Sequence, residues 1–150
     1  MIAIVRPHDW DFPLLVHVLG AMVMVGSLVL AAAALMLAWR GGGAAQVRLG
    51  YRALLLGVIP GWVVMRAGAE WIAHKEHLQN SNVTWIGIGF TTSDIGFVVM
   101  IVATVLAGLA VRRLRREGGR SGAGRPAAVL VSVLLAAYVV TIWAMTTKPT

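Results

Sequence analysis

The fold is decided by an uncharged, apolar run near the start of the chain, 13-PLLVHVLGAMVMVGSLVLAAAALMLAW-39. About 20 helical residues span a hydrocarbon core roughly 30 Å thick, so this run is long enough to cross a bilayer. Three later runs, also mainly apolar and of spanning length, occupy residues 51–78, 92–113 and 127–146. We therefore predict an all-α fold in which one domain, residues 1–150, forms a bundle of four transmembrane helices.

The composition favours an integral membrane protein. Hydrophobic residues make up 59% of the 150 residues and charged residues only 13%, whereas soluble domains carry about 25% charged residues. The chain has no cysteine, which excludes disulfides, iron–sulfur ligation and covalent haem attachment through a Cys-x-x-Cys-His motif. The first apolar run is longer than the core of a signal peptide, so we expect it to be a retained helix.

The basic residues predict the orientation in the membrane. Nine of the 13 lie in the connections at 40–52 and 112–126: Arg40, Arg48, Arg52, Arg112, Arg113, Arg115, Arg116, Arg120 and Arg125. Positive connections stay in the cytoplasm, so both termini are expected outside a bacterial cytoplasmic (inner) membrane. For the same reason the net charge of +7 is interpreted as a topology signal, and nucleic acid is not an expected partner.

Small residues and one proline mark helix contacts in the second and third runs. Gly57 and Gly61 form a Gly-x-x-x-Gly pair that allows another helix to approach closely. Pro60 between them lacks an N–H and is expected to kink the helix. In the third run, a seam of small residues is expected along one face: Ala103, Thr104, Ala107 and Gly108.

Ionisable residues gather where the runs meet the outer side of the membrane. Four of them share one stripe of the second helix: Arg66, Glu70, His74 and His77. Arg66 and Glu70 are four residues apart and are expected to form an ion pair. His17 lies in the first turns of helix one, and Asp94 opens the predicted third helix. Such groups are costly in hydrocarbon, so they usually pair or mark a site.

One interpretation of this cluster is structural. The Arg66–Glu70 ion pair would fix the helix register, and the histidines would be solvated. Asp94 would cap or complement the N-terminus of the third helix. No cofactor is needed in this interpretation.

Two further interpretations involve a cofactor. Glu70, His74 and His77 would suit a transition metal (copper, zinc or iron), with Asp94 or His17 completing the ligands. Alternatively, His17 with either His74 or His77 would supply the axial ligands of haem b between facing helices. The sequence leaves all three interpretations open.

Parts of the chain resemble known membrane families. Residues 15–20, LVHVLG, resemble the first helix of uncharacterised small four-helix proteins of actinobacteria and of copper-resistance D-type membrane proteins. Residues 64–72, 86–90 and 143–149 resemble the uncharacterised family as well. This resemblance implies a four-helix membrane fold without an established activity, and the copper-resistance resemblance carries over only His17. The Glu70-x-x-x-His74 element is similar to an outer-face element of haem A synthases.

The expected function is that of a small accessory, non-catalytic membrane protein with an outer-face His/Glu/Arg cluster for a metal ion or haem. A purely structural subunit of a larger membrane complex and a small transporter are the alternatives. No nucleophile elbow, phosphate-binding glycine loop or His-Glu-x-x-His motif is present. The expected partners are the lipid bilayer and either further copies of the chain or a larger complex.

Overall fold

The computed structural model describes residues 11–75, 84–117 and 124–147, and all of its regular structure is helical. Its elements are α1 (Asp11–Trp39), α2 (Ala44–Ala53), η2 (Leu54–Val58), α3 (Ile59–Lys75), α4 (Thr84–Glu117) and α5 (Arg125–Thr147). The segments α2, η2 and α3 follow without a break and act as one long helix. Four helices are long and apolar enough to cross a membrane: Asp11–Trp39, Ala44–Lys75, Gly89–Arg116 and Arg125–Ala144. The predicted all-α bundle of four membrane helices is confirmed.

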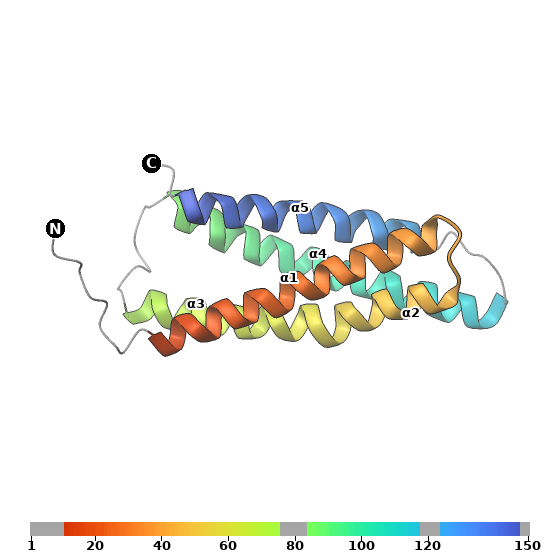
Figure 1. The fold of residues 1–150 in the computed structure, drawn as a ribbon, viewed down its shortest axis with the longest axis horizontal. Helices are drawn as coiled ribbons and strands as arrows, with labels where there is room; N and C mark the ends of the chain where they lie inside the picture. Colours follow the sequence, from red (N-terminus) through yellow and green to blue (C-terminus); the bar gives the residue numbers. More distant parts are fainter. Residues whose placement is uncertain (1–10, 76–83, 118–123, 148–150) are drawn as a thin grey trace.

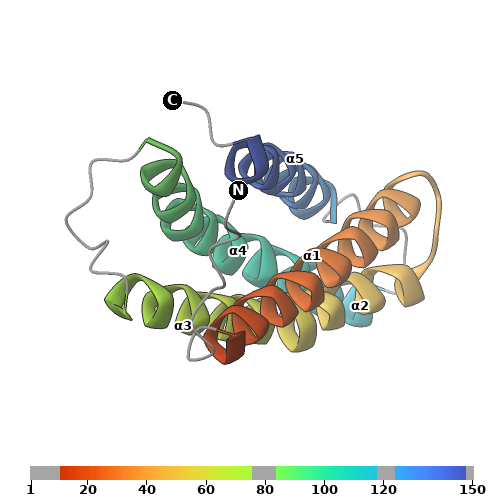
Figure 2. The ribbon, with the colours of Figure 1, turned by 60° about the vertical axis from the view of Figure 1, so that its left-hand side comes forward.

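The helices pack as two neighbouring layers, with α1 lying along α2–α3 and α4 lying along α5 (Figure 1). At one end of the bundle α1 begins, α3 ends, α4 begins and α5 ends; we call this the ion-pair end, because Arg66, Glu70 and Asp94 lie toward it. The opposite end, which carries the exposed arginines of α2, α4 and α5, is called the arginine end. Toward the ion-pair end the backbones of α3 and α4 diverge (Figure 2).

The interior is aliphatic and rich in alanine. Side chains of α1, η2, α4 and α5 are at most 1% exposed there, including Met24, Leu28, Leu54, Met100, Ala103, Ala107 and Val131. The row of small residues expected in the third run lies inside the bundle at three positions: Ala103 and Ala107 are fully buried, and Thr104 is 7% exposed. Large apolar side chains also cover the outside, such as Met22, Leu56 and Val98. Such an apolar exterior fits contact with lipid, which solvates these side chains as well as the interior does.

Glycines bring α1 and α3 to backbone contact. A Cβ atom added at Gly61 would lie 2.7 Å from the Met24 nitrogen, and one at Gly68 would lie 2.6 Å from the His17 nitrogen. A Cβ at Gly57 would collide with the Ser27 side chain. The close helix contact predicted from Gly57 and Gly61 is therefore confirmed, and it continues along α3 to Gly68.

The second membrane helix begins seven residues earlier than predicted, at Ala44 instead of Tyr51. Gly41, with φ +115°, takes the left-handed conformation that ends α1, and the chain re-enters a helix almost at once. The residues interpreted as a basic connection form an amphipathic first segment, in which Val47 and Gly50 are buried and Arg48 is exposed. The arginines misled the prediction because they lie on the exposed face of a helix.

A widened turn precedes Pro60, where the sequence predicts a kink. In η2 the backbone N–H of Ile59 donates to the Leu54 carbonyl, five residues back. Pro60 cannot donate a hydrogen bond, and its ring would clash with the carbonyl four residues earlier in a regular α-helix. The extra residue in the turn is the local response, as in the π-bulges found inside other α-helices.

Candidate functional site

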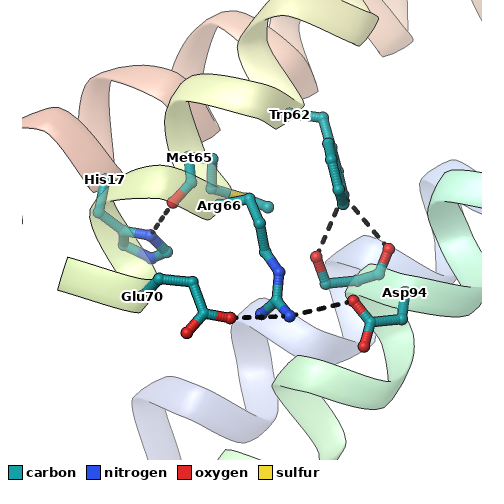
Figure 3. A network of polar contacts seen from close by, with 7 residues as sticks. His17, Trp62, Met65, Arg66, Glu70 and Asp94 are labelled. Atoms are coloured by element: carbon teal, nitrogen blue, oxygen red, sulfur yellow. Dashed lines mark hydrogen bonds and ion pairs between the residues drawn. The ribbon is translucent and has the colours of Figure 1, made fainter. Parts of the chain in front are cut away.

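Arg66 joins α3 to α4 at the ion-pair end (Figure 3). Its Nη2 atom lies 2.9 Å from Glu70 Oε1, one turn along α3, and 3.3 Å from Asp94 Oδ1 on α4. The guanidinium carbon is also 4.5 Å from the ring centre of Phe90, within the range of a cation–π contact. We call Arg66, Glu70 and Asp94 the charge cluster. It places one guanidinium between two carboxylates of different helices.

The cluster is partly open. The Arg66 side chain is 22% exposed, whereas Glu70 is 49% and Asp94 60% exposed. Between Asp94 and Arg112, α4 has only uncharged residues, over roughly 27 Å at 1.5 Å per residue. That length is close to the roughly 30 Å thickness of a hydrocarbon core. If Arg112 lies at one edge of the core, Asp94 therefore lies near the opposite edge. The charge cluster is thus suited to the boundary between hydrocarbon and headgroups.

Asp94 does not cap a helix, contrary to the structural interpretation of the sequence. Helix α4 begins at Thr84, so Asp94 lies well inside it and its carboxylate pairs with Arg66. The prediction placed the start near residue 92 because Gly87, Gly89 and the Thr-Thr-Ser segment resemble a connection. Glycine is common inside membrane helices, and here the helix continues through it.

A polar and aromatic layer lies one turn deeper, between the same two helices. The indole Nε1–H of Trp62 donates to the Ser93 carbonyl oxygen at 3.2 Å and to its hydroxyl oxygen at 3.1 Å. The Trp62 ring stacks on Phe97, with centroids 4.1 Å apart and planes inclined by 22°. Long side chains, and not close backbones, therefore connect α3 to α4.

His17 reaches from α1 to the backbone of α3. Its Nδ1 atom lies 2.9 Å from the Met65 carbonyl oxygen (Figure 3). A carbonyl oxygen only accepts hydrogen bonds, so Nδ1 carries the proton and the lone pair of the neutral ring is on Nε2. The contact follows from Gly68, which allows the backbone of α1 to approach at His17.

The structure does not assemble the predicted metal ligands among the residues that it describes. His74 is exposed on the last turn of α3, while Glu70 and Asp94 are turned toward Arg66. His77 lies outside the described residues. Within those residues no three His, Asp or Glu side chains come together as a metal site requires.

Three contributors to this region were missed from the sequence. Phe90 and Ser93 precede Asp94 on α4 and contact Arg66 and Trp62, respectively. Tyr138 of α5 is 4% exposed. A tyrosine inside an apolar run could have been noticed, because a buried phenol usually finds a hydrogen-bond partner. The position of Phe90 near the end of an apolar run predicts an aromatic side chain at the outer interface, but not its contact with Arg66. For Ser93 the only signal was its nearness to Asp94.

Known proteins add no assignment to this geometry. A comparison found no matching family model, no matching curated protein and no matching solved structure. The function must therefore be argued from the site, which offers a bridging arginine, one oriented histidine and a buried phenol.

Proposed function

We propose that this small integral membrane protein has an accessory, structural and non-catalytic role in a bacterial cytoplasmic membrane. In this role Arg66 fastens the outer ends of α3 and α4, and both termini face outward. The observation that carries the proposal is that one guanidinium bridges carboxylates of two helices whose backbones diverge. In a structural subunit of a larger membrane complex, such a bridge would hold the outer ends of α3 and α4 in one arrangement, on which a partner protein could dock.

The chemistry of the charge cluster supports a fastening role. Arginine stays protonated at physiological pH and cannot act as a general acid or base there. Its Nη2 atom carries two N–H donors, enough for one to each carboxylate. The indole of Trp62 adds a second tie to α4 through Ser93. Both connections act between α3 and α4, whose backbones make few close contacts.

Paired spin labels can test the fastening directly, because the chain has no native cysteine. Ala67→Cys on α3 and Ile95→Cys on α4 place labels on exposed positions beside the cluster. In lipid nanodiscs we expect a narrow distance distribution for this pair. Adding Arg66→Gln should broaden the distribution and move its mean to longer distance, because the bridge to Asp94 is lost.

The matched control is Arg115→Gln, which removes an exposed arginine at the arginine end. It should leave the distribution between the two labels unchanged. An Arg66→Gln distribution that overlays the parent would show that the cluster does not hold α3 to α4, and the structural role would lose its support.

Haem binding through His17 is the second candidate, and a specific observation favours it. Histidines that bind metals usually donate their other ring N–H to a carbonyl or carboxylate, which fixes the tautomer. The Nδ1 contact of His17 with Met65 has this form and leaves Nε2 as the basic atom. Residues that would supply a second axial ligand are His74, which is exposed, and His77, which lies outside the described residues.

A spectrum and elemental analysis of the same purified sample separate the two candidates. If His17 binds haem, protein expressed with a haem precursor should show a Soret band, and His17→Ala should abolish it. Under the structural proposal neither the parent nor His17→Ala shows the band, and copper, zinc and iron stay far below one ion per chain. His74→Ala tests the second ligand: loss of the band would assign His74 to it, and an unchanged band would leave His77.

A further inference from the structure

At the arginine end, α2 and α4 carry arginines on neighbouring sides. The Tyr51 ring of α2 packs on Gly108 of α4, where an added Cβ atom would lie 3.1 Å from Tyr51 Cε2. Successive residues advance about 100° around a helix. Arg48 precedes Tyr51 by three residues, and Arg112 follows Gly108 by four, so each lies on nearly the same side of its helix as this contact. Because α2 begins and α4 ends at the arginine end, both arginines lie one turn closer to that end than the contact.

Two more arginines extend this arrangement by one turn on each helix. We call the four residues the arginine cluster, and all of them are exposed: Arg48, Arg52, Arg112 and Arg115. Arginine remains protonated at physiological pH, and like charges three or four residues apart on one helix repel each other. Four positive charges on adjacent helices therefore favour an anion between them.

The described part of the chain places its carboxylates elsewhere. Asp11, Glu70 and Asp94 lie toward the ion-pair end. Glu117, the last residue of α4, is nine residues after Gly108, and its position is therefore about 180° around the helix from the contact with α2. Among the described residues, no carboxylate position lies on the side of α4 that faces α2.

The depth of the arginine cluster suits lipid headgroups. Arg112 lies at one edge of the hydrocarbon core when Asp94 lies near the other, and Arg115 is then about 4–5 Å further out. On the membrane side of the arginines, the surface of the same two helices is apolar: Leu55 is 40% exposed and Val105 is 55% exposed. Positive charge at headgroup level thus continues directly into an apolar surface at the level of acyl chains.

We propose that the arginine cluster binds the phosphate of an anionic phospholipid in the leaflet at the arginine end. The guanidinium groups of α2 and α4 donate hydrogen bonds to the phosphate oxygens, and the acyl chains lie along Leu55 and Val105. Basic sites between membrane helices are a known form of lipid recognition. The proposal concerns the end of the bundle opposite to the charge cluster, so it does not depend on the fastening role of Arg66.

Native mass spectrometry of protein released from detergent tests the site with phosphatidylglycerol and phosphatidylcholine of identical acyl chains. The parent should bind phosphatidylglycerol in preference to the zwitterionic lipid. Combining Arg48→Gln with Arg112→Gln should weaken phosphatidylglycerol binding about 20-fold, because each basic residue contributes to the attraction. An unchanged preference in this double variant would overturn the proposal.

The matched control is Arg40→Gln combined with Arg113→Gln, which removes the same charge from the same end of the bundle. Arg40 follows α1, and Arg113 lies about 140° around α4 from Gly108. This double variant should keep the preference for phosphatidylglycerol. Equal losses in both double variants would show that the whole basic end attracts anionic lipid diffusely, and the specific site would be wrong.

Brominated lipids locate the acyl chains, because bromine quenches a fluorescent label that it contacts. Val105→Cys on α4 and Val133→Cys on α5 give single labelling sites with similar exposure, 55% and 60%. In phosphatidylcholine nanodiscs, a small fraction of brominated phosphatidylglycerol should quench the label at position 105 more than the label at position 133. The excess should disappear when Arg48→Gln and Arg112→Gln are added. Equal quenching at both positions would overturn the proposed place of the acyl chains.

Inorganic phosphate distinguishes a lipid headgroup from a free anion of the same chemistry. At equal ionic strength, phosphate and chloride should reduce the excess quenching of the label at position 105 to the same extent, because the acyl chains hold the lipid in place. Displacement by phosphate alone would assign the arginine cluster to a soluble phosphate and overturn the lipid site.

Discussion

Replacing Gly20 by alanine should lower the free energy of unfolding by about 2–3 kcal/mol, near the upper end of overpacking effects. Gly20 is buried where α1 crosses α3, and an added Cβ would overlap the backbone nitrogen of Met65 and contact its Cα at 2.8 Å. Backbone atoms of a helix cannot rotate away as a side chain does. The two helices must therefore separate along the contact that also includes Gly61 and Gly68.

The same helix supplies the control for this prediction. Gly26 is exposed, and a Cβ atom there would meet nothing within 4 Å. Gly26→Ala should leave stability unchanged or raise it slightly, because alanine favours a helix over glycine by about 1 kcal/mol. Reversible unfolding in mixed micelles, followed by tryptophan fluorescence, measures both variants. Equal losses in the two variants would mean that helix contact at Gly20 is not the cause.

Arg66→Met should lower the free energy of unfolding by about 2 kcal/mol, between the values for exposed and buried ion pairs. The substitution keeps a long apolar stem but leaves Glu70 and Asp94 without their shared cation. Two carboxylates near the hydrocarbon boundary then repel each other, and α3 loses its charged tie to α4. The Arg66 side chain is 22% exposed, so the loss of stability should lie between that of an exposed and that of a fully buried ion pair.

Neutralising the two carboxylates identifies the origin of that loss. Arg66→Met combined with Glu70→Gln and Asp94→Asn should recover most of the stability, because no charge then remains uncompensated. Arg66→Lys should recover only part of it, since a lysine ammonium is a compact, strongly hydrated charge that does not stack on the Phe90 ring as the guanidinium does. A triple variant as unstable as Arg66→Met alone would indicate that packing of the arginine stem, and not charge, is what matters.

The membrane fold could be predicted from the sequence because its signals are local. Apolar runs of spanning length require helices, since a helix satisfies its own backbone hydrogen bonds in lipid. The Gly57–Gly61 spacing likewise predicted close helix contact, and the approach of the Met24 backbone to Gly61 confirms it. The pairing of Arg66 with Glu70 needed only the four-residue spacing of one helix.

The contacts between helices could not be predicted in the same way. Whether Asp94 pairs with Arg66 depends on the residue at which α4 begins and on the rotation of α4 about its axis. Apolar residues surround this helix on all sides, so the sequence pattern determines neither its start nor its rotation. Tyr138 and Gly96 meet across α5 and α4, at positions that no spacing in the chain relates. The start of α2 was obscured because Arg48 is equally typical of a connection and of an exposed helix face.

The widened turn η2 has a consequence for the geometry of the cluster. One additional residue in a helical turn changes the phase of everything that follows by about 100° around the helix axis. Everything from Ile59 onward, including Arg66, therefore points in a direction that a regular helix starting at Ala44 would not give it. The direction in which the Arg66 guanidinium points toward α4 therefore depends on the widened turn η2. That turn lies earlier in the same helix, next to Pro60, which takes no part in the ion pairs.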